Sequence, residues 1–285
     1  MATIIDGKQL AAKVRAELIE RVAKLKAHGV TPGLTVVLVG EDPASQIYVG
    51  AKEKMCGEVG IASAIMRLPA NTSQDELLAV VQRLNADDAV HGILIQMPLP
   101  SGIDEDTALR AISPEKDVDG FHPVNAGMLF LGKPRFVPCT PLGIMRMFDD
   151  IGYDLAGKEA VVIGRSNIVG KPMAQLLLMR SATVTICHSR TKNLAETTRR
   201  ADVVVVAIGK RNFLTADMVK PGAVVIDVGI NRREGSRKID GDVDYAAVEP
   251  IASAITPVPG GVGPMTVTML MQSTVESAER AAGLS

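Results

Sequence analysis

A tyrosine and a lysine lie four residues apart, at Tyr48 and Lys52, in a segment with helical spacing. Side chains at positions i and i+4 lie on one face of a helix, so the phenol and the amine are expected side by side. Ile47, Ala51 and Met55 form an apolar stripe next to them. Burial against that stripe would lower the pKa of Lys52 and make it a proton carrier near neutral pH. By itself, however, such a pair is most often a solvated helix face.

Two more polar positions stand where a ligand could be held. Gln96 lies near the carboxyl end of an expected strand over 92–97, and ligands of open α/β sheets bind outside such ends. The loop 116–121 carries Asp119, whose carboxylate could pair with the N–H groups of a heterocycle. Acidic loop residues are more often turn formers, so this second signal is weak alone.

A glycine turn, Gly164 to Gly170, follows an expected strand over 159–163 and opens a helix. Such a turn lets backbone N–H groups approach a phosphate, and the positive end of the helix favours its charge. Ser166 stands where the second glycine of the usual G-x-G-x-x-G pattern would be. A turn without a ligand therefore remains an equally good interpretation of this segment alone.

The end of the next expected strand indicates which dinucleotide such a turn would bind. NAD-binding folds usually place an acid there for the ribose 2′-hydroxyl, but this strand is followed by His188, Ser189 and Arg190. Arg165 and Ser189 are donors suited to a 2′-phosphate, which a carboxylate would repel. NADP is therefore preferred to NAD, although Arg190 is as well explained as a solvated loop charge.

A stiff, glycine-rich loop at 257–266, with Pro259, Gly260 and Gly261, allows close backbone approach to a planar ligand or a phosphate. No metal site is expected, because the four histidines show no ligand spacing. Acids at 240, 242 and 244 alternate as in a calcium loop, but Tyr245 and Ile251 occupy the positions that need Gly and Glu.

Strand-sized apolar runs alternate with helix-length amphipathic segments along the whole chain, which indicates βαβ units and mostly parallel sheets. We predict an α/β fold of two α/β domains around a cleft, the second a Rossmann-like dinucleotide-binding domain. The first covers 1–140, with a C-terminal helix over 266–285 packing back on it, and the second covers 141–265. Strands are expected at 34–39, 92–97, 159–163, 183–187, 203–207 and 223–228, and helices at 10–25, 44–59, from Ser73, from Thr140 as N-cap, from Gly170, and at 266–282.

Composition excludes several partners. The 31 basic and 32 acidic residues leave a net charge of -1, and only 3% of residues are aromatic, which argues against nucleic acid. No apolar run is long enough to span a membrane, and the start has no export or transit pattern. Three dispersed cysteines form no paired spacing, which favours a reducing compartment, the cytoplasm.

In combination and in order, these motifs resemble the bifunctional methylenetetrahydrofolate dehydrogenase/methenyltetrahydrofolate cyclohydrolase family over essentially the whole chain. The resemblance implies oxidation of 5,10-methylenetetrahydrofolate with NADP and hydrolysis of the product to 10-formyltetrahydrofolate. These reactions belong to one-carbon metabolism and purine biosynthesis. It also implies tetrahydrofolate derivatives as ligands and a homodimer.

By that resemblance Lys52 is the central catalytic residue, Gln96 orients it, and Tyr48 stacks near the folate. Asp119 would hold the pterin ring, and Pro259, Gly260 and Gly261 would line the folate and nicotinamide cleft. The cofactor contacts would be Gly164, Arg165, Ser166, Ser189 and Ile230. The alternative is another NADP-dependent oxidoreductase, of the shikimate or amino-acid dehydrogenase type. It would share the second domain but would not explain Tyr48, Lys52, Gln96 and Asp119.

Overall fold

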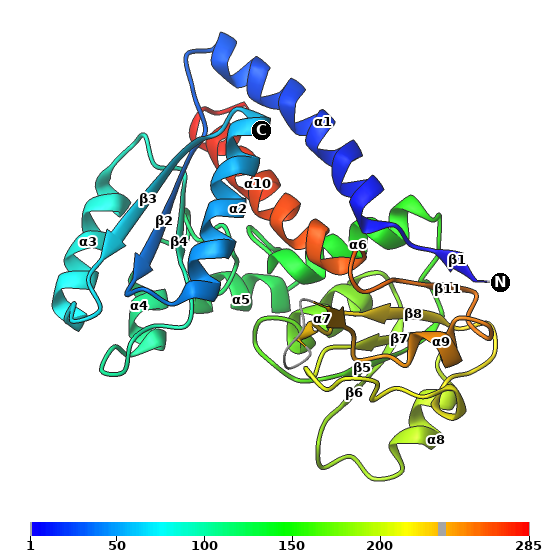
Figure 1. The fold of residues 1–285 in the computed structure, drawn as a ribbon. Coiled ribbons are helices and arrows are strands. Elements are labelled where there is room, and N and C mark those ends of the chain that lie inside the picture. The colour runs from blue at the N-terminus through cyan, green and yellow to red at the C-terminus, as the bar shows by residue number, and fades with distance from the viewer. Residues whose placement is uncertain (1, 233–237, 285) are drawn as a thin grey trace. The chain divides into compact units, whose positions relative to one another are not determined.

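The computed structural model describes residues 2–232 and 238–284 (Figure 1). Its internal contacts divide the chain into two units. Unit 1 comprises Met1–Ala12 and Thr140–Thr266, and unit 2 comprises Lys13–Cys139 and Val267–Ser285. The boundaries fall inside three helices, namely α1 (Gly7–Ala27), α6 (Cys139–Asp150) and α10 (Val262–Ala281).

A parallel sheet of three described strands, in the order β3-β2-β4, lies at the centre of unit 2. Every residue of its central strand is buried, because Gly33–Val39 is an almost continuous apolar run with a neighbour on both edges. The unit's elements are β2 (Gly33–Val39), α2 (Pro43–Val59), β3 (Ala62–Leu68), α3 (Gln74–Ala86), β4 (Gly92–Ile95), α4 (Glu105–Ala111) and α5 (Pro123–Phe130).

Helices cover the sheet of unit 2, with α3 to one side and α2 to the other (Figure 1). Helix α3 begins at a capping box in which the Ser73 hydroxyl accepts from the Glu76 backbone and the Glu76 carboxylate accepts from Ser73. Leu77, Val81 and Leu84 of this helix form a core with Val37 and other apolar residues of β2 and β4. This core fixes the strand ends near which Gln96 stands.

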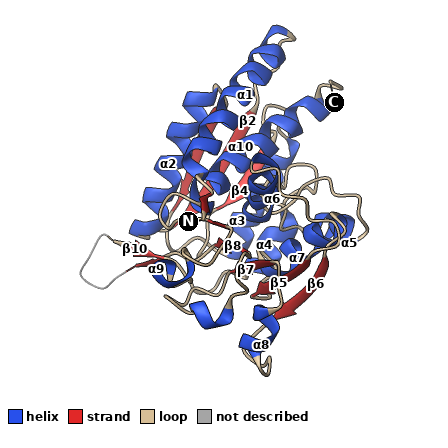
Figure 2. Ribbon diagram, turned by 90° about the vertical axis from the view of Figure 1, so that its right-hand side faces the viewer, coloured by secondary structure: helices blue, strands red, loops and turns tan. Residues whose placement is uncertain are grey.

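Unit 1 is built on a parallel sheet of six described strands in the order β1-β11-β8-β7-β5-β6, with β5, β6, β7 and β8 side by side (Figure 2). Four valines, Val203–Val206, form the fully buried strand β7. The remaining elements are β1 (Thr3–Ile4), β5 (Glu159–Ile163), α7 (Gly170–Met179), β6 (Thr183–Cys187), α8 (Leu194–Arg199), β7, a 3-10 turn (Ala216–Met218), β8 (Val224–Asp227), β9 (Asn231–Arg232), β10 (Ile239–Asp240), α9 (Tyr245–Val248) and β11 (Ala254–Ile255).

The α/β class and its parallel sheets are as predicted, with several local differences. The N-cap predicted at Thr140 is wrong, because α6 already begins at Cys139 and the Thr140 hydroxyl lies 2.9 Å from that of Thr266. The last helix begins at Val262, inside the expected loop. Strand β3 was not anticipated, and residues up to Ala12 group with unit 1, since β1 pairs with β11.

Candidate functional site

Lys52 lies on the buried side of helix α2, although the apolar stripe expected beside it is wrong. Ile47 is 67% exposed, and the buried apolar positions of the helix are instead Val49, Cys56 and Val59. These residues and Lys52 are three or four positions apart, so they share one face. Lys52 itself is half-buried, and burial lowers the pKa of its amine.

Gln96 holds this amine. The backbone N–H of Gln96 donates to Val37 O at 2.9 Å, which continues the β4–β2 pairing by one residue. Its side-chain Nε2 donates to Met97 O at 2.7 Å, so Oε1 is the atom left to face the lysine. Lys52 Nζ donates to that Oε1 at 3.0 Å. The strand end and the amide geometry therefore together orient the ammonium group.

Asp119 supplies the negative charge near this pair. Burial raises the pKa of Asp119, Lys52 opposes that shift, and Asp119 in turn raises the pKa of Lys52. The carboxylate's loop is held by Asp117, which accepts from the backbone of Phe121 and His122 and from Asn125 Nδ2 at 2.7 Å. Within unit 2, Lys52 is thus hydrogen-bonded to Gln96, and Asp119 is close enough to shift the pKa of Lys52.

The Cys139 thiol lies against Asp119 and is fully enclosed. Burial raises the pKa of this thiol well above its ordinary value, and the neighbouring carboxylate raises it further. The thiol is therefore protonated and is a poor nucleophile. Tyr48, one helical turn before Lys52, is 41% exposed, so its ring can meet a ligand from solvent.

The glycine turn of unit 1 is tightly built. Gly164 has φ +128°, and a Cβ there would lie 2.4 Å from Ala207 O, while a Cβ on Gly170 would lie 2.3 Å from Gly164 O. The Ser166 hydroxyl accepts from the N–H groups of Val169 and Gly170, where α7 begins. Arg165 is exposed beside this helix start. The positive end of α7 and the exposed Arg165 can attract an anion, while the N–H groups of Val169 and Gly170 are already bonded to Ser166.

Ser189 and Ile230 stand at the same edge of the sheet as this turn. Ser189 follows β6 and Ile230 follows β8, and the carboxyl ends of parallel strands lie at one edge. The 188–191 turn is held by its own side chains, since His188 N–H donates to Thr191 Oγ1 at 2.9 Å. Ser189 and Arg190 are exposed there, and Ile230 is 51% exposed.

Pro259, Gly260 and Gly261 also belong to unit 1. Gly261 N–H donates to Pro257 O at 2.8 Å, and Lys8 N–H donates to Gly260 O at 3.1 Å, so the loop is held against the first turn of α1. A Cβ on Gly7 would lie 1.9 Å from Gly261 O, which makes this close approach of two backbones possible only for glycine.

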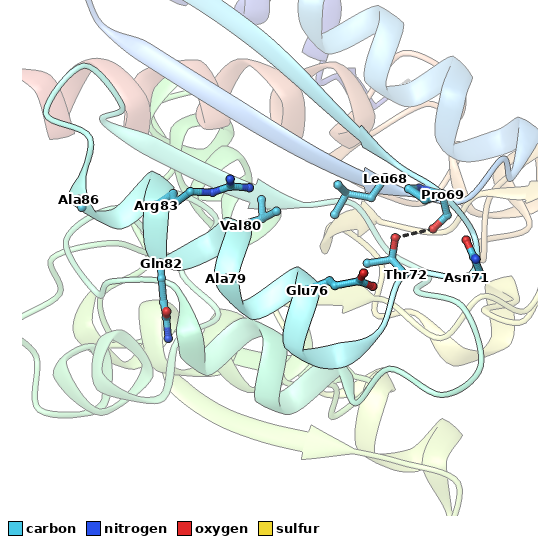
Figure 3. Close-up of a pocket in the computed structure, with 10 residues that line it drawn as sticks. All are labelled: Leu68, Pro69, Asn71, Thr72, Glu76, Ala79, Val80, Gln82, Arg83 and Ala86. Carbon is cyan, nitrogen blue, oxygen red and sulfur yellow. Dashed lines mark hydrogen bonds between the residues drawn. The ribbon is translucent and has the colours of Figure 1, made fainter.

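A groove of about 760 Å³ lies elsewhere in unit 2, between β3 and α3 (Figure 3). Leu68 and Val80 line it, and two of its polar residues are used locally. Thr72 Oγ1 donates to Pro69 O at 2.7 Å, and Glu76 completes the capping box. The residues that line this groove include no predicted site residue.

Sequence reasoning missed two buried carboxylates of unit 1, Asp227 at the end of β8 and Asp242. Both are held by N–H donors, and burial raises the pKa of Asp227 to about 6. An acid at the end of an apolar strand was the available signal for Asp227. For Asp242 the sequence offers only the rejected calcium-loop pattern.

Comparison with known proteins gives two family matches. Residues 5–119 match the tetrahydrofolate dehydrogenase/cyclohydrolase catalytic domain, and residues 138–282 match the NAD(P)-binding domain of the same family. Proteins called bifunctional protein FolD are similar throughout. The one from Polaromonas sp. is 61% identical, covering 98% of this chain and 99% of its own. The one from Streptococcus pneumoniae serotype 4 is 60% identical, covering 98% of each.

Solved structures agree. The bifunctional FolD enzyme from Campylobacter jejuni has a TM-score of 0.97 at 53% identity, covering 98% of this chain and 99% of its own. The Trypanosoma brucei methylenetetrahydrofolate dehydrogenase-cyclohydrolase, complexed with NADP cofactor and an inhibitor, has a TM-score of 0.94 at 40% identity, covering 99% and 98%.

Fold and site together define an α/β oxidoreductase with an NAD(P)-binding domain. The chain belongs to the tetrahydrofolate dehydrogenase/cyclohydrolase family. It is a bifunctional enzyme of folate one-carbon metabolism, with dehydrogenase and cyclohydrolase activities. The shikimate-type alternative is not supported, because the match includes the catalytic domain of this family. No helix within the described residues is long and apolar enough to cross a membrane.

Proposed function

We propose that unit 2 binds the folate and carries the proton transfers, with Lys52 as the catalytic residue. The observation that carries this assignment is the 3.0 Å hydrogen bond from Lys52 Nζ to Gln96, together with burial that lowers the pKa of the lysine. Gln96 orients the amine, Asp119 holds the N–H groups of the pterin, and the exposed ring of Tyr48 stacks on the folate.

The oxidation step needs no side chain as a base. Hydride leaves the methylene carbon between two folate nitrogens, and their lone pairs stabilise the resulting cation. When bound, NADP supplies the hydride acceptor. Pro259, Gly260 and Gly261 offer backbone for close approach of flat rings. What the chain contributes here is orientation of the two reactants.

Hydrolysis is the step that uses Lys52. A water oxygen bonds to the cationic carbon and loses a proton, and one C–N bond breaks as its nitrogen gains a proton. The neutral amine takes the proton from water, and the ammonium returns it to the leaving nitrogen. A lysine whose pKa is lowered by burial suits both transfers. Asp119 limits that lowering, since its charge stabilises the ammonium form.

NADP is proposed to bind at the carboxyl edge of the sheet of unit 1. The glycine turn at Gly164 and Gly170 fits a phosphate at the start of α7. Arg165, Ser166 and Ser189 supply exposed donors there. Of these, Arg165 and Ser189 are proposed to bind the ribose 2′-phosphate. Ile230 adds an apolar contact. The absence of an acid after β6 favours NADP over NAD, because a carboxylate would repel the 2′-phosphate.

The assembly and compartment are further parts of the proposal. We expect a homodimer, as the family resemblance implies, and a cytoplasmic enzyme. The second expectation is supported by three cysteines that are buried and free.

A spectrophotometric assay tests the proposal directly. Purified protein with methylenetetrahydrofolate and NADP should form NADPH, and the rate should fall strongly when NAD replaces NADP. Methenyltetrahydrofolate alone should be hydrolysed. Equal rates with NAD would reject the roles of Arg165 and Ser189, and no NADPH with the folate present would reject the whole assignment.

Substitution of Lys52 tests its role. Lys52→Ala should lower the cyclohydrolase rate about 10²–10⁴-fold, the range of general acid–base catalysis, and leave NADPH binding unchanged. Lys54→Ala is the matched control, since Lys54 is on the same helix but exposed. Unchanged hydrolysis by Lys52→Ala would remove Lys52 from the mechanism.

A further inference from the structure

The loops that follow β7 and β8 are organised by one buried carboxylate, that of Asp242. Its side chain has no exposed surface, yet four N–H groups donate to it. Ile208 and Gly209 donate backbone N–H to Oδ2 at 2.8 and 2.9 Å, and Lys210 donates to Oδ1 at 2.7 Å. Asn231 Nδ2 donates to Oδ1 at 2.9 Å. One side chain thus joins two loops at the sheet edge where the cofactor is proposed to bind.

A second buried carboxylate, that of Asp227, holds the backbone of Asp242. Asp227, the last residue of β8, accepts from the backbone N–H of Gly229, Asp242 and Val243 at 2.8–2.9 Å. Asp227 is itself 3% exposed, and its own N–H donates to Thr256. The backbone of Asp242 is therefore fixed by hydrogen bonds to the end of β8.

Strand pairing brings Asp242 to this position. Strand β9 pairs antiparallel with β10, with Asn231 opposite Asp240, so the segment just before Asp242 lies alongside the segment after β8. Gly229 allows the close approach, because a Cβ there would lie 2.3 Å from Asp242 Oδ1. The carboxylate consequently fills the space beneath the Gly229–Asn231 turn.

We propose that Asp242 is a positioning residue for NADP. Its carboxylate holds the 208–210 and 229–231 loops in the single arrangement that presents Ile230 and the neighbouring backbone to the cofactor. This inference rests on the proposed cofactor site and deepens it. The carboxylate touches loops rather than substrate, so its removal should weaken cofactor binding and spare hydrolysis, which needs no NADP.

The test compares the two activities of one variant. Asp242→Asn keeps the shape but turns one acceptor oxygen into a donor that faces N–H groups. We expect the KM for NADP and the Kd for NADPH to rise about tenfold, the equivalent of one or two lost hydrogen bonds. The dehydrogenase kcat should change less, and the cyclohydrolase kcat/KM should stay unchanged. Asp244→Asn is the matched control, since Asp244 makes no side-chain capping bond to α9.

Asn231→Ala covers the case in which Asp242→Asn fails to fold. It removes the side-chain amide that donates through Nδ2 and leaves the carboxylate in place, and the KM for NADP should rise about threefold. An unchanged KM for NADP in the folded variants overturns the proposal, and so does a parallel loss of both activities. Calorimetric binding of NADPH needs no folate turnover. It therefore tests Asp242 even if the wild-type protein failed to oxidise methylenetetrahydrofolate.

Discussion

The site lysine owes its chemistry to how a glutamine amide is oriented. Gln96 Nε2 donates to Met97 O, so the oxygen of the amide must face Lys52 Nζ. An ordinary exposed lysine would be ammonium at every physiological pH. Burial shifts the balance toward the amine, while Asp119 shifts it back. The two opposing effects leave a group able to both take and return a proton.

The balance between burial and the charge of Asp119 in setting the pKa of Lys52 can be measured by removing the Asp119 carboxylate. Asp119→Asn deletes the charge that raises the pKa of Lys52, so that pKa should fall further. The rise of the cyclohydrolase kcat with pH, measured at saturating folate, should then move to lower pH. Glu53→Gln removes an equal charge from the exposed neighbouring residue and should leave the profile in place. A shift in the opposite direction would contradict the assignment of the neutral amine as the base.

At the level of single residues, the sequence predicts types and spacing better than orientation. Tyr48 and Lys52 do share a helix, and Gln96 does follow a strand. The buried face of α2 was assigned to the wrong side, because Ile47 is apolar yet exposed. Apolar periodicity identifies a helix, but when the spacing within one turn fits two faces, it does not determine which face is buried. Asp242 was missed because three of its four donors are backbone N–H groups, which no side-chain pattern records.

Glycines in two helices give opposite expectations for one substitution. Gly170→Ala would place a Cβ 2.3 Å from Gly164 O, so the turn at the start of α7 must open. The KM for NADP should rise and the cyclohydrolase rate should not change. Gly127→Ala, inside α5 with nothing within 4 Å, should instead stabilise the protein by about 0.5–1 kcal/mol. Urea unfolding and the paired assays check both. Unaltered NADP kinetics in Gly170→Ala would show that the turn does not bind the cofactor.

Elements with a strong local apolar pattern were predictable, including the four-residue strand β7, whereas β3, which has no fully buried position, and the two-residue strands were not. Helix α1 and strands β2, β5 and β6 have local apolar patterns long enough to identify. The two-residue strands β1 and β11 have no such pattern, because they exist only through pairing with distant chain segments. Thr140-Pro141 is a good N-cap and first helical residue by composition, but α6 begins two residues before Pro141, at Cys139.

The stability of the whole molecule should depend on pH through buried acids. Burial raises the pKa of Asp117 and of Asp227 to about 6, from an ordinary 3.8. Between these values the folded chain binds more protons than the unfolded chain, so stability falls as pH rises and the loss is complete above pH 6. Each carboxyl accounts for about 3 kcal/mol of the pH-dependent change in the free energy of unfolding. Burial lowers the pKa of His91, so below pH 6.5 the contribution of this one group to stability rises with pH. It opposes the effect of the two carboxyls in that range.

Urea unfolding should therefore require more denaturant at pH 5 than at pH 7.5. Asp104 and Asp202 have lowered pKa values, and their contributions are lost only on further acidification below their ordinary 3.8. A midpoint that fell steadily from pH 7.5 to pH 5 would show that neither buried carboxyl is protonated in the folded protein.

The pairing of β1 with β11 has a consequence for how the chain is made. Thr3 lies opposite Ala254, so roughly 250 residues must be synthesised between the two strands, which takes about 12–50 s at about 5–20 residues per second. Throughout that interval the backbone of Thr3–Ile4 can bond only to water or to the wrong strand. Strand β1, made first, is thus among the last strands to join the sheet of unit 1. A ribosome that stalls before Ala254 leaves the buried strand β8 at the edge of that sheet.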